Sequence, residues 1–103
     1  MIETSGKKLA GPIIRLHPND NIVVARIDIG IGTEVPSEHF TSRSQVPAGY
    51  KIAAKKILKG EPILKYNVTV GFANTDIEAG TMVHSHNTEF REFDRDYAYA
   101  SEF

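Results

Sequence analysis

Apolar residues along the chain occur in short runs between turn-forming residues, and the pattern begins at Ile13. Residues 13–17 and 22–27 are rich in Ile and Val, which favour strands. Residues 18–21 (Pro-Asn-Asp-Asn) predict a turn, because Pro fixes φ while Asn and Asp tolerate unusual backbone angles. Helical periodicity is weak, and only residues 51–58 are predicted as a short helix, with a strand as the alternative. The pattern therefore predicts a mostly β protein of short strands.

A small motif recurs four times and indicates how these strands bend. In each copy an aliphatic residue is followed by two variable residues, a glycine, two further variable residues and a second aliphatic. Glycine can take positive φ without strain, so each copy predicts a tight corner whose aliphatic side chains enter the core. The spacing of the copies is irregular, which argues against a solenoid. The alternative interpretation is that each glycine lies in an ordinary loop and forms no special corner. The copies span residues 29–35, 46–52, 57–63 and 77–83.

Composition narrows the class of protein. The chain has 103 residues, the size of one domain, and contains no cysteine, which excludes disulfides, zinc-thiolate sites and thiol catalysis. Twelve basic and thirteen acidic residues give a net charge of −1, so neither nucleic acid nor anionic lipid is an expected partner. No apolar run has the length of a membrane span, and the N-terminus does not resemble a signal peptide. A cytoplasmic location is therefore expected.

The pattern divides the chain into three parts. Residues 1–12 are polar and predicted to be a flexible leader, and residues 13–87 form the predicted β domain. Residues 88–103 are predicted to connect to a further domain, with a short helix over residues 90–98 as one reading. Five aromatic residues interleaved with charges in this last part predict that it packs against this domain or another. They are Phe90, Phe93, Tyr97, Tyr99 and Phe103.

The sharpest candidate for chemistry is His84-Ser85-His86-Asn87. On a strand, His84 and His86 would lie on the same face, where two imidazoles can hold a metal or one can donate a proton. Two imidazoles do not complete a metal site, and spacing fixes no third ligand. The alternative is a pair of partly exposed histidines at a strand end, with Asn87 as a turn or helix cap. The candidates for a third ligand are His17, Asp20, His39 and Glu89.

Lysines dominate the segment from residue 51 to residue 65, where Glu61 is the only acidic residue. Such a group can attract an anionic sugar acid or a phosphate. Because few aromatic residues are interleaved with it, a platform for single-stranded nucleic acid is not indicated. A solvated charged face is the favoured interpretation. The group consists of Lys51, Lys55, Lys56, Lys59 and Lys65.

Five stretches, in order, resemble the N-terminal SAF domain of the altronate and galactarate dehydratases, and a related small subunit occurs in sulfolactate sulfo-lyase. Together they cover residues 13–87, and residues 93–98 are similar to the family's connector into its large catalytic domain. The stretches are residues 16–25 (LHPNDNIVVA), 46–53 (VPAGYKIA), 63–66 (ILKY), 70–73 (VGFA) and 77–87 (IEAGTMVHSHN).

The resemblance implies a β-clip fold and a role in a hydro-lyase that converts a sugar acid to a 2-keto-3-deoxy acid. It also implies a divalent metal, typically Fe²⁺, held mostly by a large catalytic domain or subunit outside this chain. His86 and His84 would then contact substrate or metal, or donate a proton. Asn87 and Ser85 would orient them and the substrate. The His-x-His-Asn pattern is more like the altronate branch than the galactarate branch.

The predicted function is an accessory domain or small subunit of a metal-dependent sugar-acid dehydratase, inactive alone because it lacks a base and a complete metal site. A ligand-binding module without catalytic duty is the first alternative, since related β-clip domains are appended to sialic acid synthases. An assembly domain is the second. The particular sugar acid and any homo-oligomeric state stay open.

Overall fold

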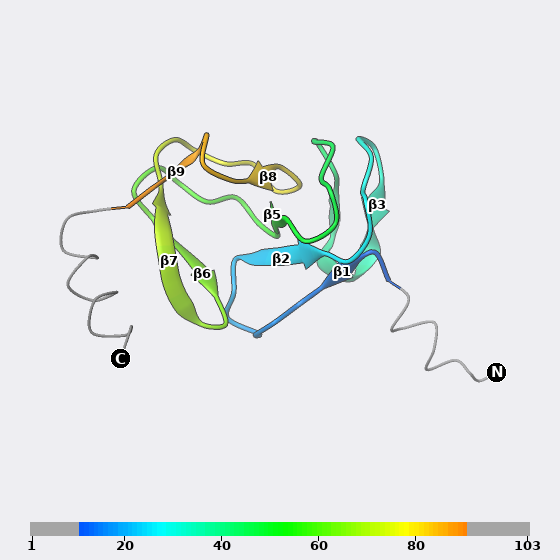
Figure 1. The fold of residues 1–103 in the computed structure, drawn as a ribbon, viewed down its shortest axis with the longest axis horizontal. Coiled ribbons are helices and arrows are strands. Elements are labelled where there is room, and N and C mark those ends of the chain that lie inside the picture. The colour runs from blue at the N-terminus through cyan, green and yellow to red at the C-terminus, as the bar shows by residue number, and fades with distance from the viewer. Residues whose placement is uncertain (1–10, 91–103) are drawn as a thin grey trace.

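The computed structural model describes residues 11–90 (Figure 1). Most of the predicted leader, residues 1–10, and most of the predicted connector, residues 91–103, lie outside this range, as does most of the helix proposed over residues 90–98. The elements are β1 (Ile13–Ile14), β2 (Ile22–Ala25), β3 (Glu34–Val35), the 3₁₀ turn η1 (Pro36–Glu38), β4 (Phe40–Thr41), β5 (Lys51–Ala53), β6 (Pro62–Lys65), β7 (Val68–Ala73), β8 (Met82–Val83) and β9 (Thr88–Glu89).

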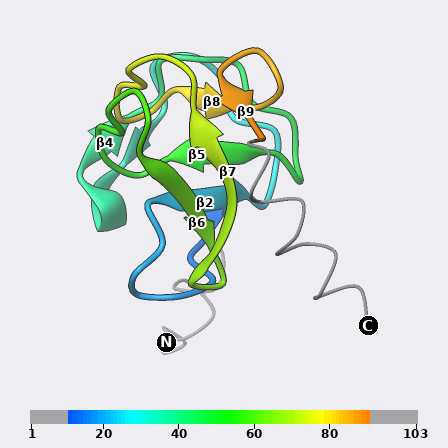
Figure 2. The same ribbon diagram turned by 90° about the vertical axis from the view of Figure 1, so that its left-hand side faces the viewer.

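The strands form a central antiparallel sheet, in the order β1-β2-β5-β8, and two smaller antiparallel sheets. Strands β6, β7 and β9 make one of the smaller sheets and the β3–β4 pair makes the other. Figure 1 shows the β6–β7 hairpin at one end of the central sheet and β3 at the other. In the turned view of Figure 2 the β6–β7 hairpin crosses in front of β2 and β5. The prediction of a mostly β fold with short, bent strands is confirmed.

Of the two predictions for residues 51–58, the short helix is wrong and the strand is correct for the first three residues. Lys51–Ala53 is strand β5, and Ile57 forms an isolated antiparallel bridge with Ile77. The aliphatic residues of this segment belong to two successive corners, so their spacing follows the glycine motif and not the 3.6-residue period of a helix.

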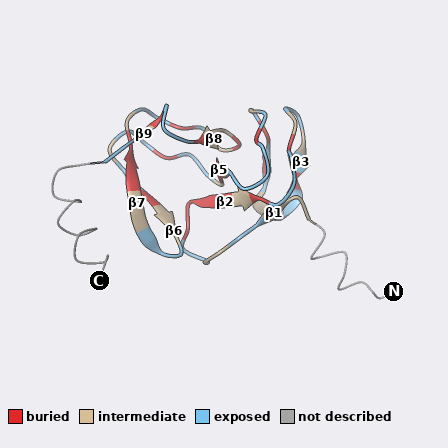
Figure 3. Ribbon diagram, viewed as in Figure 1, coloured by how far each residue is buried: buried red, intermediate tan, exposed pale blue. Residues whose placement is uncertain are grey.

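Two hydrophobic clusters cover opposite faces of the central sheet. Successive residues of a strand point to opposite faces, so Ile22 enters one cluster and its neighbour Val23 enters the other. Figure 3 shows this buried interior running through β2 and into the upper half of β7. The first cluster, which we call the hairpin-side core, contains Ile22, Ala53, Ile57, Ile63, Ala73, Ile77 and Val83. The second contains Val23, Ala25, Ile29, Val35, Phe40, Val46 and Ile52.

All four predicted glycine corners are present. Their glycines have φ between 89° and 92°, and each corner is closed by a backbone hydrogen bond of the β-turn type, such as that from the Tyr50 N–H to the Pro47 carbonyl at 3.1 Å. All eight flanking aliphatic residues are at most 2% exposed. Burial of these side chains supplies the main favourable term in folding. The four glycines are Gly32, Gly49, Gly60 and Gly80.

The corners also share one pattern of hydrogen bonds to their partners. In each corner, the glycine N–H donates to the carbonyl of a small buried residue. The N–H of that small residue donates in turn to the carbonyl of the residue that follows the glycine. The corners pair two by two, through Ile29 with Val46 and through Ile57 with Ile77. One backbone unit is therefore used four times. The glycine and small-residue partners are Gly32 with Ser42, Gly49 with Ala25, Gly60 with Ala73 and Gly80 with Ala53.

Two buried polar residues attach the β6–β7 hairpin to the sheet. The two carboxylate oxygens of Asp20 accept hydrogen bonds from the Tyr66 N–H at 2.8 Å and the Asn67 N–H at 2.6 Å. Both hairpin residues have positive φ, 57° and 62°, as a tight primed turn requires. Asn21 bonds the edge of β6 through the Leu64 N–H and the Pro62 carbonyl. The predicted turn over residues 18–21 is therefore also the anchor of a distant hairpin.

Candidate functional site

The histidine motif forms a turn that follows strand β8. Strand β8 ends at Val83, and the N–H of Asn87 donates to the carbonyl of His84 at 3.1 Å, which closes the turn. The two histidines therefore follow the strand end, as the alternative interpretation has it, and their i, i+2 spacing does not set a common face. His84, Ser85 and His86 are all exposed. We call residues 84–87 the histidine turn.

Asn87 has a different environment from the other three residues of the histidine turn. Its side chain is buried, with 4% of the residue exposed. Its Oδ1 accepts from the His84 N–H at 3.0 Å and its Nδ2 donates to the Met82 carbonyl at 2.9 Å. These bonds fix the backbone of the turn and leave no polar atom of the side chain directed at solvent. The side chain of Asn87 therefore caps the turn, as the alternative interpretation predicts, and its role in orienting the histidines or the substrate stays a prediction.

Tyr50 is the neighbour that the sequence did not single out. Its ring lies edge-on to the His84 imidazole, with 5.0 Å between ring centroids and 62° between planes. The contact arises because Lys51 of β5 pairs with Val83 of β8, which brings the residues at the adjoining strand ends together. Tyr50 directly follows the Gly49 corner, so the repeated corner unit is what places an aromatic ring beside the histidine turn.

The proposed third metal ligands do not join the histidine turn. In residues 11–90, no three His, Asp or Glu side chains gather closely enough to hold a metal ion. Asp20 is occupied by the hairpin N–H groups, and the Nδ1 of His17 accepts from the Asn19 N–H at 3.0 Å. His39 ends η1, and Glu89 lies on β9. By themselves the described residues do not fit a divalent metal, because two imidazoles fall short of the three protein ligands that a catalytic site needs.

The predicted lysine group is split by the fold. Lys55, Lys56 and Lys59 are exposed, as expected for a solvated face, whereas Lys51 and Lys65 are half-buried. The desolvation of Lys51 lowers the pKa of its ammonium below 10.5, and the positive charge of Lys65 lowers it further. The interpretation of one solvated face therefore holds for three of the five lysines.

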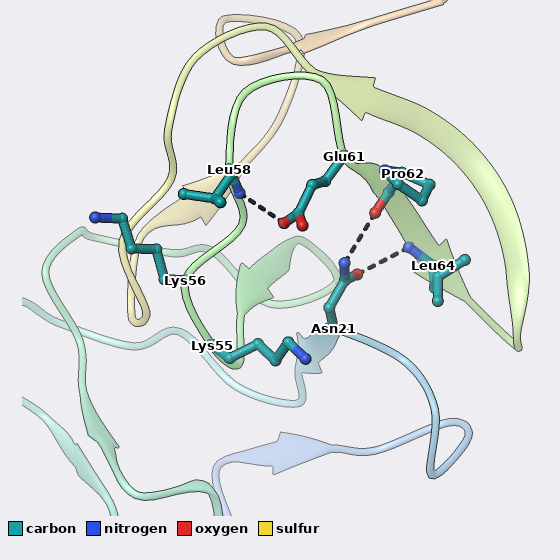
Figure 4. Close-up of a pocket in the computed structure, with 7 residues that line it drawn as sticks. All are labelled: Asn21, Lys55, Lys56, Leu58, Glu61, Pro62 and Leu64. Carbon is teal, nitrogen blue, oxygen red and sulfur yellow. Dashed lines mark hydrogen bonds between the residues drawn. The ribbon is translucent and has the colours of Figure 1, made fainter.

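Two of the exposed lysines border an open hollow of about 410 Å³ (Figure 4). Glu61 at its rim accepts from the Leu58 N–H at 2.8 Å, and Lys56 pairs with Glu78 at 3.3 Å. Asn21, whose amide forms part of the wall, is bound to β6. Most polar groups of this hollow are thus bonded to the protein, and the hollow is distinct from the histidine turn.

Comparison with known proteins decides the family. Residues 11–91 match the altronate/galactarate dehydratase SAF domain. The chain belongs to this family. Over 93 residues, the SAF domain is 41% identical to the altronate dehydratase of Escherichia coli (strain K12) and 31% identical to that of Bacillus subtilis (strain 168). Each alignment covers 87% of the chain but 19% of the relative, so the chain spans about a fifth of the length of these relatives.

A second kind of relative is a short subunit. The SAF domain is 32% identical over 54 residues to the alpha subunit of (2R)-sulfolactate sulfo-lyase from Paracoccus pantotrophus, a match that covers 52% of the chain and 81% of that subunit. Relatives of this domain therefore occur both as a small part of a dehydratase and as a separate subunit of a lyase. Among the described residues, no helix is long and apolar enough to cross a membrane.

Proposed function

We propose that this SAF domain is an accessory part of a sugar-acid dehydratase and that its histidine turn contributes to the active site of the large catalytic domain. The observation that carries the proposal is a turn with two exposed histidines, His84 and His86, whose backbone is hydrogen-bonded to the buried side chain of Asn87. A polar turn of this kind, in a domain whose relatives are dehydratases, supports a role in contact with substrate.

Dehydration of a sugar acid needs a base and an acid. The base takes the proton from the carbon next to the carboxylate, and the hydroxyl on the following carbon leaves as water after it accepts a proton. The resulting enol becomes the 2-keto-3-deoxy acid. An exposed imidazole can donate the proton to the leaving hydroxyl or hydrogen-bond to the substrate. His84 and His86 are proposed for these roles, and Ser85 offers a further hydroxyl at the same turn.

The divalent metal of the proposed enzyme, Fe²⁺ in our prediction, belongs in this proposal to the catalytic domain. When bound there, it would stabilise the negative charge that develops on the substrate carboxylate. No three His, Asp or Glu side chains gather among residues 11–90, so no step of the reaction is attributed to a metal on this chain. For the same reason we propose that the isolated chain is inactive. Altronate is the favoured substrate over galactarate, supported by the 41% identity with an altronate dehydratase.

The test replaces His84 and His86 by alanine in the full-length enzyme that carries this domain. We expect each variant to lose roughly 10–100-fold or more in kcat/KM for altronate, measured as formation of the 2-keto-3-deoxy acid. His39→Asn is the matched control. His39 is exposed, directly follows η1 and has φ 62°, a conformation that Asn tolerates. If both alanine variants keep the parent rate, the domain serves assembly or binding only.

A second experiment separates proton donation from binding. A general acid shapes the alkaline side of the pH profile of kcat, so a variant without it loses that dependence. A histidine that only binds substrate raises KM and leaves the shape of the profile unchanged. Turnover of altronate by the 103-residue chain itself, supplied with Fe²⁺, would refute the accessory role.

A further inference from the structure

Lys51 lies within the face of the central sheet that carries the hairpin-side core. It sits on β5 between Val24 of β2 and Val83 of β8, which are its direct cross-strand neighbours. Ile22 and Ala53 occupy the next position along the same face and are fully buried. A lysine at this position has apolar cross-strand neighbours for its aliphatic stem, and Lys51 is half-buried there.

The strand that covers this face adds a second positive charge. Lys65, at the end of β6, is half-buried and close enough for its charge to reduce the pKa of Lys51. The neighbours of Lys51 on β2 and β8 are Val24 and Val83, neither of which carries a charge. Among residues 11–90, neither lysine side chain makes a hydrogen bond or an ion pair. The fold therefore brings two half-buried lysines together, and the described residues supply no counter-charge.

Such an arrangement is unfavourable for the domain alone. Desolvation and the charge of Lys65 both oppose the charged form of Lys51, and an apolar residue in place of Lys51 would avoid them. Two other cations of the domain do have acidic partners: Arg15 binds both carboxylate oxygens of Glu38, at 2.7 and 2.8 Å, and Lys56 pairs with Glu78. A carboxylate from outside the described residues would offset the desolvation and the repulsion at Lys51.

We propose that Lys51 and Lys65 form a binding site for one carboxylate group. The carboxylate belongs either to a dissolved sugar acid or to an acidic side chain of the catalytic domain. Either one would form charge-assisted hydrogen bonds with the two ammonium groups. The site does not depend on the histidines, although Lys51 directly follows Tyr50, which contacts His84. This inference therefore stands or falls separately from the proposed role of the histidine turn.

The first experiment tests the dissolved acid on the 103-residue chain. NMR signals of the lysine ε-methylene groups are followed during titration with galactarate, which carries a carboxylate at each end, and with galactitol, its uncharged counterpart. We expect galactarate alone to shift the Lys51 and Lys65 signals and to raise the pKa of Lys51. Lys51→Gln or Lys65→Gln should weaken binding roughly tenfold, the equivalent of one charge-assisted hydrogen bond. Lys59→Gln, at an exposed corner, is the matched control.

The second experiment tests the protein carboxylate in the full-length enzyme. If galactarate leaves the lysine signals of the free chain unmoved, we expect Lys51→Gln and Lys65→Gln to lower the melting temperature of the full-length enzyme, whereas Lys59→Gln does not. Either positive result supports the carboxylate site and identifies its source. Unmoved signals in the first experiment together with unchanged melting in the second would overturn the proposal. Failure of the histidine variants to reduce turnover would not affect either readout.

Discussion

The side-chain Oδ1 of Asn87 accepts a hydrogen bond from the backbone N–H of His84 at 3.0 Å, inside a turn whose other three side chains are exposed. Asn87→Ala removes this bond and the one to the Met82 carbonyl at 2.9 Å. Two part-buried backbone groups then lose their partners, which costs about 1–3 kcal/mol for each group that water does not reach. We expect a loss of about that size in the free energy of unfolding, measured by urea denaturation of the chain.

The matched control for Asn87→Ala is His86→Ala in the same turn. Its side chain is exposed, so its effect should stay within about 0.5 kcal/mol, as for most surface substitutions. Equal stability of the two variants would contradict the role assigned to Asn87. The comparison also tells whether a loss of turnover in Asn87→Ala comes from the turn backbone, because His86→Ala changes chemistry and leaves the backbone intact.

The corner glycines permit a second comparison, between Gly80 and Gly49. Both have φ near 90°, where any residue with a Cβ is strained by about 1–2 kcal/mol. A Cβ on Gly49 would meet open space, whereas one on Gly80 would collide with the backbone carbonyl of Thr41. We expect Gly49→Ala to cost the strain alone and Gly80→Ala to cost clearly more, to the point of preventing folding. Thermal melts followed by circular dichroism measure both, and equal costs would show that the approach to Thr41 is not tight.

Asp20 provides a third prediction, because its carboxylate holds the turn of the β6–β7 hairpin. Asp20→Ala leaves the Tyr66 and Asn67 N–H groups without their acceptor, and a loss of about 1–3 kcal/mol for each is expected if water does not replace it. Amide hydrogen exchange should accelerate at these two residues and along the hairpin, more than at Ile52 on β5. The control is Asp28→Ala, which removes an exposed side chain that accepts one bond, from the Ala48 N–H at 2.9 Å. Uniform acceleration over the whole chain would argue against a local anchor.

The sequence predicts the corners well because their requirements are local. A glycine at each corner and an aliphatic residue three positions away on either side reflect backbone strain and burial, and all four corners form as expected. Which corners pair is not encoded in this motif, because the pairing bonds join backbone groups that every residue carries. Pairs such as Ile29 with Val46 depend instead on how the whole chain packs.

The candidate site illustrates the same limit. The residue types of the histidine turn are visible in the sequence, but the turn itself follows from the Asn87 side chain, which could equally have capped a helix. Tyr50 and Lys51 gain their significance from strands β5 and β8, which are joined only in the fold. Lys51 looks like Lys59 in the sequence, and only the packing of β6 over the sheet distinguishes a half-buried lysine from an exposed one.

The position of Lys51 leads to a prediction about pH. Its pKa in the folded chain lies below 10.5, because desolvation and the charge of Lys65 disfavour the ammonium form. Between the folded and unfolded pKa values the unfolded chain binds more protons, so the free energy of unfolding rises with pH in that window. The penalty is fully present at neutral pH and disappears as the pH approaches 10.5. Lys51→Met, which keeps the stem and removes the charge, should therefore stabilise the free chain at neutral pH.

The gain from Lys51→Met should be modest, within the ~0–1 kcal/mol that solvent screening leaves to partly exposed charges. It should shrink as the pH is raised towards 10.5, and Lys59→Met, at an exposed position, should show neither the gain nor its pH dependence. Denaturation midpoints of the three proteins across this range measure the effect. A Lys51→Met variant less stable than the parent chain at neutral pH would mean that a counter-charge already neutralises Lys51 within the chain, and the carboxylate would then not have to come from substrate or partner.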